Sequence, residues 1–205
     1  MKISYAITVC NEEEEVKRLL LKLDTYKREE DEICVLLDKP KASSSLLSFL
    51  EEYSSTGKIN LKESEFKGNF SEWKNELNRL CKGDYIFQID ADEIPAASLI
   101  DILPTVIQQD VDVIFIPRVN IVLDITDDHL TKWGWRKDQD NKINWPDFQW
   151  RLYKNVSYIR WINKVHERLE GFKTYSYLPQ FEEYALIHIK NIDRQERQNE
   201  FYDEL

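Results

Sequence analysis

Hydrophobic positions in the first 120 residues alternate between two spacings, one typical of β-strands and the other of α-helices. Short apolar runs are followed by stretches in which apolar residues return every three or four positions, as in Val16, Leu19, Leu20 and Leu23. We therefore expect strands over residues 3–9, 32–38, 58–64, 84–90 and 111–119. The helical spacing predicts a helix that starts near residue 12 and helices over 43–53, 70–81 and 96–108.

Regular alternation of strands and helices predicts an α/β fold, in which a mostly parallel sheet is covered by helices on both faces. Beyond residue 120 the pattern changes to short strand-like pieces at 148–155, 156–161 and 183–189, followed by a polar helix from about Asp193. No linker rich in Gly, Pro or Ser separates the two parts. We expect a single domain over residues 1–205, with a nucleotide-fold half over 1–120 and a site-shaping half over 121–205.

Local signals suggest where two of these helices begin. Asn11 is a good cap for the first helix, and the acids at 12–15 suit the positive end of its dipole. Pro95 fits the first turn of the helix after the fourth strand. Glu93 then either starts that helix or supports the acids that precede it.

Charge and hydropathy exclude two classes of partner. The formal net charge of −10 argues against general binding to a nucleic-acid backbone, which requires a basic face. The chain has no run of about eighteen apolar residues that could span a membrane, and its first residues lack the pattern of a signal peptide.

Cys10, Cys34 and Cys81 are far apart in apolar settings, which indicates buried thiols in a reducing cytoplasm.

Three acids follow the fourth predicted strand at once, in the stretch YIFQIDADEIP. Ligands of open parallel sheets bind at the carboxyl ends of the strands, where Asp90 and Asp92 fall. With Ala91 between them on an extended backbone, the two carboxylates point to the same side. They would suit Mg²⁺ or Mn²⁺ held together with a diphosphate. The alternative is a solvated acidic turn that only ends the strand.

Five blocks of sequence carry a family resemblance. TVCNEEEEVKRLL, NFSEWKNELNRLCKGDYIFQIDADE, PDFQWRLYKN, KVHERLEG and ALIHI occur in this order between residues 3 and about 188. Together they resemble the family-2 glycosyltransferases of the GT-A fold, especially the branch similar to lipopolysaccharide-core β-glucosyltransferases. The resemblance implies inverting transfer of a sugar from a nucleotide-diphosphate donor, with Mn²⁺ or Mg²⁺ as cofactor. It makes 1–120 the nucleotide-sugar-binding half and 121–205 the acceptor-side half.

The resemblance also suggests roles for the acids at the strand ends. Asp90-Ala91-Asp92 matches the family's DXD motif, which implies that Asp92 ligates the metal and that Asp90 contacts the ribose or a metal-bound water. Asp38 matches the acid that contacts the nucleobase, although the following DKPKASS departs from the family pattern. We expect a uridine-type donor.

Further donor-side residues follow from the same blocks. Lys74-Asn75 resembles an Arg-Asn pair that holds the pyrophosphate or the base, although Lys lacks the bidentate fork of Arg. His166 is a candidate for contact with the diphosphate. The first loop of the family borders the nucleoside, and the matching residues here are Thr8, Val9, Asn11 and Glu12.

An inverting transfer needs one carboxylate that takes the proton of the acceptor hydroxyl. Asp147 resembles the family's acceptor-side acid and is slightly favoured, and Glu167 in VHERLEG is the second candidate. Their alternatives are a turn acid after Pro146 and an ion pair with Arg168 or Arg151, respectively. His188 resembles the late histidine that completes a metal shell, or else is a buried structural residue.

The acceptor is expected to be a glycan or a glycolipid. Trp133, Trp135 and Trp150 could form a stacking platform for it and Arg151 could neutralise a phosphate, with core packing and surface charge as the alternatives.

Two competing functions stay open. A GT-A scaffold could bind sugar nucleotide without turnover. A nucleotidyltransferase would be expected to carry a glycine-rich phosphate loop, and the chain has only five glycines. We expect a cytoplasmic protein, peripheral at a membrane if its acceptor is lipid-linked, or in the host cytoplasm if it is viral. Further domains or a homo-oligomer are also open.

Overall fold

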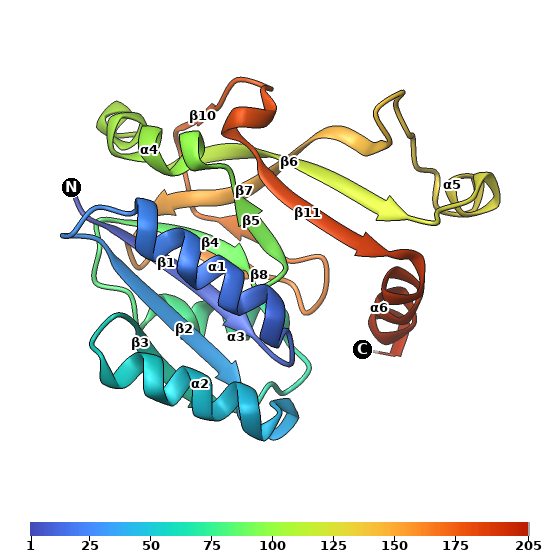
Figure 1. Ribbon diagram of the computed structural model, residues 1–205. Coiled ribbons are helices and arrows are strands. Elements are labelled where there is room, and N and C mark those ends of the chain that lie inside the picture. The colour runs from blue at the N-terminus through green and yellow to red at the C-terminus, as the bar shows by residue number, and fades with distance from the viewer. Residues whose placement is uncertain (205) are drawn as a thin grey trace.

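The computed structural model describes residues 1–204 and is built around one nine-stranded sheet (Figure 1). Its strands are β1 Ile3–Val9, β2 Glu32–Asp38, β3 Asn60–Ser64, β4 Tyr85–Asp90, β5 Glu93–Pro95, β6 Val113–Leu123, β7 Lys142–Lys154, β10 Tyr175–Tyr177 and β11 Leu186–Asn191. The pair β8 Arg160–Ile162 and β9 Arg168–Glu170 forms a separate small sheet. The helices are α1 Glu13–Tyr26, α2 Ser44–Ser55, α3 Phe70–Asn78, α4 Ala97–Val106, α5 Asp127–Trp133 and α6 Ile192–Glu204. Short 3-10 turns are η1 Lys39–Lys41, η2 Ile107–Gln109 and η3 Glu182–Tyr184.

Strand order in the large sheet is β3-β2-β1-β4-β7-β6-β11-β5, with β10 beside β6. The strands β1 to β4 are mutually parallel, and β7 lies antiparallel between β4 and β6. This arrangement confirms the predicted α/β fold with a mostly parallel sheet. Strands from both halves of the chain take part in it. In the register of β1 and β4, Thr8 is opposite Asp90, so the two side chains reach the same carboxyl edge.

Both faces of the sheet are covered by helices, because the parallel strands are apolar on both sides. Along β2, Ile33, Val35 and Leu37 pack with α1, α2 and α4, whereas Cys34 and Leu36 pack with α3 and the β8–β9 hairpin. The predicted helical face of α1 is fully buried in the first of these layers. Alternation along the strands thus builds two cores, one on each side of the sheet.

Two helices begin within one residue of the predicted positions, but the local signals predicted for their starts are wrong. The cap of α1 is Glu12 rather than Asn11, and its side chain makes no capping hydrogen bond. The Glu12 carboxylate instead accepts hydrogen bonds from the backbone N–H groups of Cys10 and Asn11, before the helix. Pro95 does not lie in the first turn of a helix, because Glu93–Pro95 forms β5 against β11 and α4 begins only at Ala97.

The second half of the chain contains more regular structure than its sequence pattern indicates. The longest strand, β7, covers 13 residues, of which the hydrophobic pattern predicted only the last part. Its polar residues Asp147, Gln149 and Arg151 recur at every second position and share one face. These polar residues interrupt the apolar pattern of β7, which is why the pattern did not predict the first part of the strand. The elements β5, α5, β9 and β10 were missed because they are too short to give a periodic signal.

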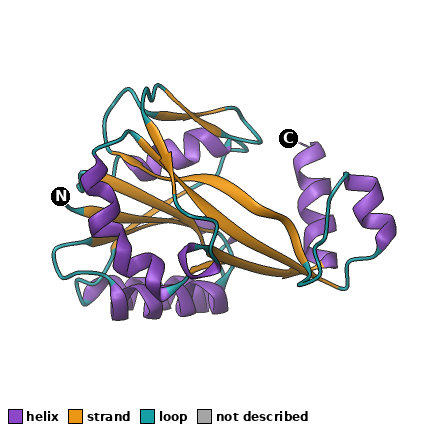
Figure 2. Ribbon diagram, turned by 90° about the horizontal axis from the view of Figure 1, so that it is seen from above, coloured by secondary structure: helices purple, strands orange, loops and turns teal. Residues whose placement is uncertain are grey.

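The last helix, α6, continues from the end of β11 and lies beside α5 at the carboxyl edge of the sheet (Figures 1 and 2). The contact between the two helices includes the His129 ring and the Glu196 carboxylate, 3.3 Å apart. Within residues 1–204, no helix is both long enough and apolar enough to cross a membrane.

The three thiols are unpaired. Cys34 and Cys81 are buried as expected, but Cys10 is half-exposed at the end of β1.

We expect Gly171→Ala to destabilise the β8–β9 hairpin, which presents Glu167. Gly171 has φ +91°, and an added Cβ would lie 1.8 Å from the Tyr158 carbonyl oxygen. Gly134 also has positive φ, but nothing lies within 4 Å of its Cβ position, so Gly134→Ala is the matched control. Urea unfolding should give a loss of about 1 kcal/mol for Gly134→Ala and about 2 kcal/mol or more for Gly171→Ala. Equal losses would show that the Tyr158 carbonyl does not restrict position 171.

Candidate active site

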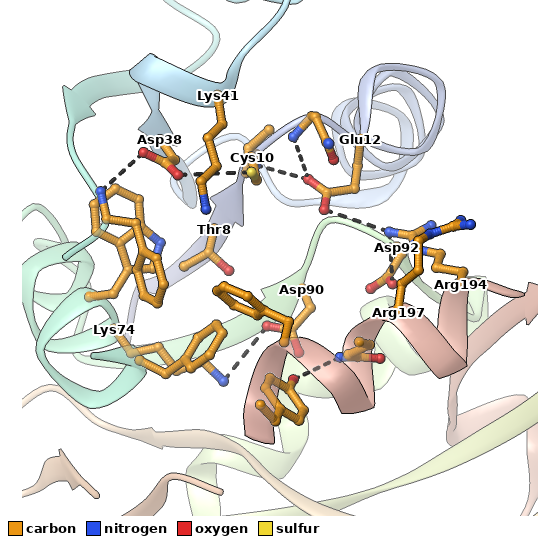
Figure 3. Close-up of a pocket in the computed structure, with 18 of the residues that line it drawn as sticks. Thr8, Cys10, Glu12, Asp38, Lys41, Lys74, Asp90, Asp92, Arg194 and Arg197 are labelled. Carbon is orange, nitrogen blue, oxygen red and sulfur yellow. Dashed lines mark hydrogen bonds and ion pairs between the residues drawn. The ribbon is translucent and has the colours of Figure 1, made fainter. Parts of the chain in front are cut away.

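Two cavities adjoin at the carboxyl edge of the sheet. The first has a volume of about 420 Å³ and lies between the ends of β1, β2 and β4 and helix α6 (Figure 3). The second has a volume of about 570 Å³ and lies over the polar face of β7. Six residues line both cavities, namely Lys74, Asp90, Asp92, Glu167, Gln198 and Tyr202. A group bound in one cavity would therefore meet a group bound in the other at these side chains.

The first cavity contains most of the donor-side residues that the sequence and its family resemblance predict. Thr8, Val9, Asn11, Glu12 and Asp38 line one side of it. Aromatic rings of Phe66, Phe70 and Trp73 line it further, together with Lys41 and, from α6, Arg194, Arg197, Phe201 and Tyr202. This mixture of aromatic surface and cations suits a ligand that has a flat ring at one end and anionic groups at the other.

Asp38 is held in place at the end of β2. Its carboxylate accepts a hydrogen bond from the backbone N–H of Phe66 at 3.0 Å. The side chain is almost fully buried, yet it borders the cavity. The DKPKASS stretch, which departs from the family pattern, forms η1 and brings Lys41 over the rings of Phe66 and Phe201.

Asp90 has a cation against each of its carboxylate oxygens. Oδ2 accepts a 2.5 Å hydrogen bond from Arg151, and Oδ1 accepts one from Gln88 at 3.0 Å and lies 3.7 Å from the Lys74 ammonium. Burial opposes the ionisation of Asp90, but Arg151 and Lys74 outweigh it and hold the pKa of this carboxyl well below its usual value. Asp90 is therefore charged and fully engaged by the chain's own side chains.

Asp92 lies at the head of a chain of hydrogen bonds that runs from the turn after β4 to β7. Its Oδ2 is 3.2 Å from Nε2 of His188, and His188 Nδ1 is 3.0 Å from Oδ1 of Asn120. The Asn120 amide nitrogen donates to Asp147 at 2.7 Å, which fixes the orientation of this amide. Since Asn120 presents an oxygen, His188 donates from Nδ1, and its Nε2 faces the Asp92 carboxylate.

Glu93 is the centre of a buried charge network. Its side chain is fully buried, and Oε1 accepts hydrogen bonds from Arg118 at 2.8 Å and from Arg151 at 2.6 Å. Its other oxygen accepts the backbone N–H of Asp90 at 3.1 Å. Arg118 continues to Asp147, so one network links the acids after β4 to the acid on β7.

Asp147 and Glu167 differ in how strongly other side chains already engage them. Asp147 accepts two hydrogen bonds from Arg118, one from Asn120 and one from Gln149, all at 2.9 Å or less. Glu167 forms an ion pair with Lys74 through one carboxylate oxygen, at 2.6 Å. Glu167 borders both cavities, whereas Asp147 borders only the second.

Only two of the three predicted metal ligands are placed so that they could bind one divalent cation together. Across residues 1–204, no three Asp, Glu, His or Cys side chains converge as a metal-binding group. The predicted set of Asp90, Asp92 and His188 is therefore not assembled, because Arg151 and Lys74 occupy the Asp90 oxygens. Asp92 and His188 do adjoin, and a carboxylate with an imidazole suits Mn²⁺ when donor phosphates complete the shell.

Several predicted site residues lie elsewhere. Asn75 does not reach the first cavity, because its amide bonds the backbone of Trp161 at 2.8 and 2.9 Å and holds the β8–β9 hairpin on α3. Ala91 is buried. His166 lies in the second cavity rather than the first, with its ring 5.8 Å from that of Tyr202.

The predicted acceptor platform forms only in part. Trp135 and Trp150 line the second cavity, but Trp133 packs between Trp135 and His129 and does not line it. Arg151 lines the second cavity, but its guanidinium is largely buried and bonds Gln88, Asp90 and Glu93.

Arg118 and the cavity-lining face of α6 were not predicted from the sequence. Arg118 belongs to a mostly apolar strand and carries no local motif. The residues of α6 that line the first cavity are five positions of a helix that reads as polar and solvent-exposed. Their spacing of three and four residues is the signal that could have revealed one buried face.

Comparison with known families identifies the chain at this point. The family model described as "Glycosyl transferase family 2" matches residues 4–174. The chain belongs to glycosyl transferase family 2. Strands β2 to β9 of this family-2 chain and all but the first residue of β1 lie inside the matched part, whereas β10, β11 and α6 lie beyond it. No curated protein matches the chain.

Solved structures agree with this fold. Residues 1–349 of S. aureus TarS, in complex with UDP-GlcNAc, match at a TM-score of 0.64 and 16% identity, over 93% of this chain and 59% of that one. The mannosyltransferase PcManGT from Pyrobaculum calidifontis, in complex with GDP-Man and Mn²⁺, matches at 0.56 and 13%, over 91% and 56%. At such identities the likeness establishes the GT-A fold alone. This family-2 chain spans less than two thirds of either protein.

We expect Glu93→Gln to destabilise the protein strongly, because it removes the charge that Arg118 and Arg151 share. Breaking a buried ion pair typically costs about 3–5 kcal/mol. Glu63→Gln, which removes a partly exposed partner of Lys39 at 2.5 Å, is the control and should cost about 1 kcal/mol or less. Guanidinium unfolding of both variants checks this. A Glu93→Gln loss no larger than that of the control would show that the two arginines are compensated by other groups.

Proposed function

We propose that this family-2 chain transfers a sugar from a nucleotide-diphosphate donor, of uridine type, to a glycan or glycolipid acceptor with inversion and with the help of a divalent cation. The observation that carries the proposal is that the two cavities share one wall, formed by Asp90, Asp92, Lys74 and Glu167. A donor in the first cavity and an acceptor in the second would bring the anomeric carbon and the attacking hydroxyl together at that wall. An in-line displacement needs this geometry and no covalent intermediate.

In this proposal the first cavity binds the nucleotide. Asp38 at the end of β2 and the rings of Phe66 and Phe70 line the part that would hold the nucleoside. Lys74 and Asp92 lie at the boundary with the second cavity, where the diphosphate would be placed. TarS was solved with UDP-GlcNAc and PcManGT with GDP-Man, so the likeness in fold leaves the base open. The uridine preference and the narrower lipopolysaccharide-core branch stay predictions from the sequence.

Asp92 and His188 would hold the cation, Mn²⁺ or Mg²⁺. The bound cation would neutralise charge that develops on the leaving diphosphate. Asp147 and Asn120 orient His188 for this role, since His188 donates from Nδ1 to the Asn120 oxygen. Asp90 would hold Arg151 and Lys74 in place rather than bind the cation, because its oxygens already bond Arg151 and Gln88 and face Lys74.

Glu167 is the better candidate for the general base. It forms its ion pair with Lys74 and lies on the wall between the cavities. Asp147, which the sequence pattern slightly favours, already accepts four hydrogen bonds, so taking a proton would break an arrangement that Arg118 stabilises. We therefore assign Asp147 to positioning and Glu167 to proton transfer.

A thermal-shift experiment tests the donor and the cation. At about one hundred times its dissociation constant, a ligand adds about 2.7 kcal/mol, which raises the melting temperature of a chain of this size by roughly 5–10 °C. We expect UDP with Mn²⁺ to give such a shift, and Asp92→Asn to lose the part that depends on Mn²⁺. Asp124→Asn, at an exposed acid that lines neither cavity, is the control.

Hydrolysis of a UDP-sugar measures whether binding leads to turnover. Slow hydrolysis that depends on Mn²⁺ supports the transferase. Binding without any turnover would indicate a sugar-nucleotide-binding module instead. A shift by guanosine nucleotides but not by UDP would contradict the uridine assignment.

Replacement of the two candidate bases should separate their roles. Loss of a general base typically lowers the rate by about 10²- to 10⁴-fold. We expect Glu167→Gln to lower kcat by this order while UDP binding is retained. Asp147→Asn should instead weaken Mn²⁺-dependent binding through His188 and Arg118. A larger kcat loss for Asp147→Asn than for Glu167→Gln would reverse the assignment.

The pH profile gives a further check on Glu167. Burial opposes its ionisation, but the charge of Lys74 prevails and holds the pKa of this carboxyl below its ordinary value of 4.5. A base with a lowered pKa stays ionised until the pH falls through that pKa. The acid limb of kcat/KM should therefore lie below pH 4.5 in the wild type and move to higher pH in Lys74→Met.

A further inference from the structure

Helix α6 turns one face toward the first cavity. The residues of α6 that line the cavity follow the three- and four-residue spacing of a single helical face, and they are Arg194, Arg197, Gln198, Phe201 and Tyr202. In the close-up, the Arg194 side chain reaches from α6 toward Glu12 and Asp92, and Arg197 lies on the same helix (Figure 3). This helix lies outside the part of the chain that the family model matches. Its role at the site therefore has to be inferred from its contacts.

The aromatic end of this face packs on the wall of the cavity. The ring of Phe70 lies 5.6 Å from that of Tyr202 and 6.4 Å from that of Phe201. The ammonium of Lys41 lies 5.1 Å from the centre of the Phe201 ring. Gln198 donates to the Tyr202 hydroxyl at 2.7 Å and accepts from Lys190 at 2.8 Å. These contacts hold α6 over the cavity and keep its arginines beside the shared wall.

Arg194 is the cation nearest to Asp92 on this helix. Its Nη2 lies 3.2 Å from Asp92 Oδ2 and 3.6 Å from Glu12 Oε1. Its Nη1 donates to Glu15, outside the cavity, at 3.0 Å. The guanidinium thus bridges the start of α1 and the acid after β4, the same place where the proposed diphosphate would lie.

The first cavity is lined by more acids than cations, which suggests why the two arginines of α6 matter there. Five acids line the cavity, namely Glu12, Asp38, Asp90, Asp92 and Glu167. Four cations line it, namely Lys41, Lys74, Arg194 and Arg197, so α6 supplies two of the four. Lys74 is already paired with Glu167 and faces Asp90. A diphosphate adds negative charge to this excess of acids, and α6 supplies half of the cations that line the cavity.

We propose that Arg194, supported by Arg197, is a positioning residue for the diphosphate of the donor. The inference rests on the proposed function and deepens it, because it assigns the phosphate contacts to a helix outside the family match. A guanidinium offers two parallel donors to a phosphate, which Lys74 cannot do. The sequence departs from the family pattern by having Lys in place of Arg at position 74, and Arg194 supplies the missing fork from α6.

A purely structural role for Arg194 makes a different prediction. If the side chain only anchors α6 to Glu15 and Glu12, its loss would let the whole helix move. The aromatic wall would then move with it, and ligands with and without phosphates would be affected alike. If Arg194 binds phosphate, only ligands that carry phosphates should be affected. Nucleoside and nucleoside diphosphate therefore distinguish the two roles.

Isothermal titration calorimetry of the whole chain provides the test. UDP and GDP are each compared with their nucleosides, uridine and guanosine, in EDTA so that no divalent cation contributes. The variants are Arg194→Gln and Arg194→Lys. Glu15→Gln, which breaks the anchor outside the cavity, and Arg18→Gln, at an exposed arginine of α1, are the matched controls.

We expect Arg194→Gln to weaken binding of the diphosphate at least tenfold and to leave binding of the nucleoside unchanged. Arg194→Lys should restore part of the loss, because it returns the charge but not the fork. Both controls should bind the diphosphate like the wild type, within about twofold.

Two results would overturn the inference while the proposed function stands. One is unchanged diphosphate binding by Arg194→Gln. The other is an equal loss for nucleoside and diphosphate, especially if Glu15→Gln shows the same loss. Failure of the wild type to bind any nucleoside diphosphate, even with Mn²⁺, would instead overturn the proposed function and this inference with it.

Discussion

Compensation of buried carboxylates by two arginines is the constraint on which the site depends. Glu93 is fully buried, and the guanidinium groups of Arg118 and Arg151 both lie against one of its oxygens, so two positive charges compensate its burial. Arg151 in turn holds Asp90, and Arg118 holds Asp147. Burial opposes the charge of both arginines, but Glu93 and Asp147 raise the pKa of Arg118, and Asp90 and Glu93 raise the pKa of Arg151, so both guanidinium groups stay charged. The acids at the carboxyl edge of the sheet are therefore already paired with cations from the chain itself.

The carboxylates at this edge of the sheet differ in how many of their hydrogen-bonding positions the network already fills. Asp90 and Asp147 have their oxygens taken by cations and amides, so they orient other groups. Asp92 and Glu167 line both cavities, as Asp90 does, but they have fewer partners. Burial and the number of donors, rather than position in a motif, decide which acid can bind a cation or accept a proton.

Helix α6 completes the first cavity from the opposite side. Helix α6 brings two arginines to the acidic rim of the sheet, on the face that also carries Phe201 and Tyr202. Arg194 pairs with Asp92 in the same way as Arg118 pairs with Asp147 and Arg151 with Asp90. Acids on the sheet are balanced by cations from elements that join it late in the chain.

The sequence by itself determined the alternation of strands and helices up to β6, the acids after β4, and the family, because these depend on local periodicity and on contiguous motifs. It did not reveal β5, α5 or the early part of β7, which are short or carry polar residues on one face. Only the tertiary structure shows which of the acids after β4 are paired with other side chains, and with which ones. The partners of Asp90 and Asp92 come from far along the chain, since Arg151 is 61 residues from Asp90 and His188 is 96 residues from Asp92. A carboxylate's charge and reactivity depend on the neighbours that folding brings to it, and local sequence carries no signal for them.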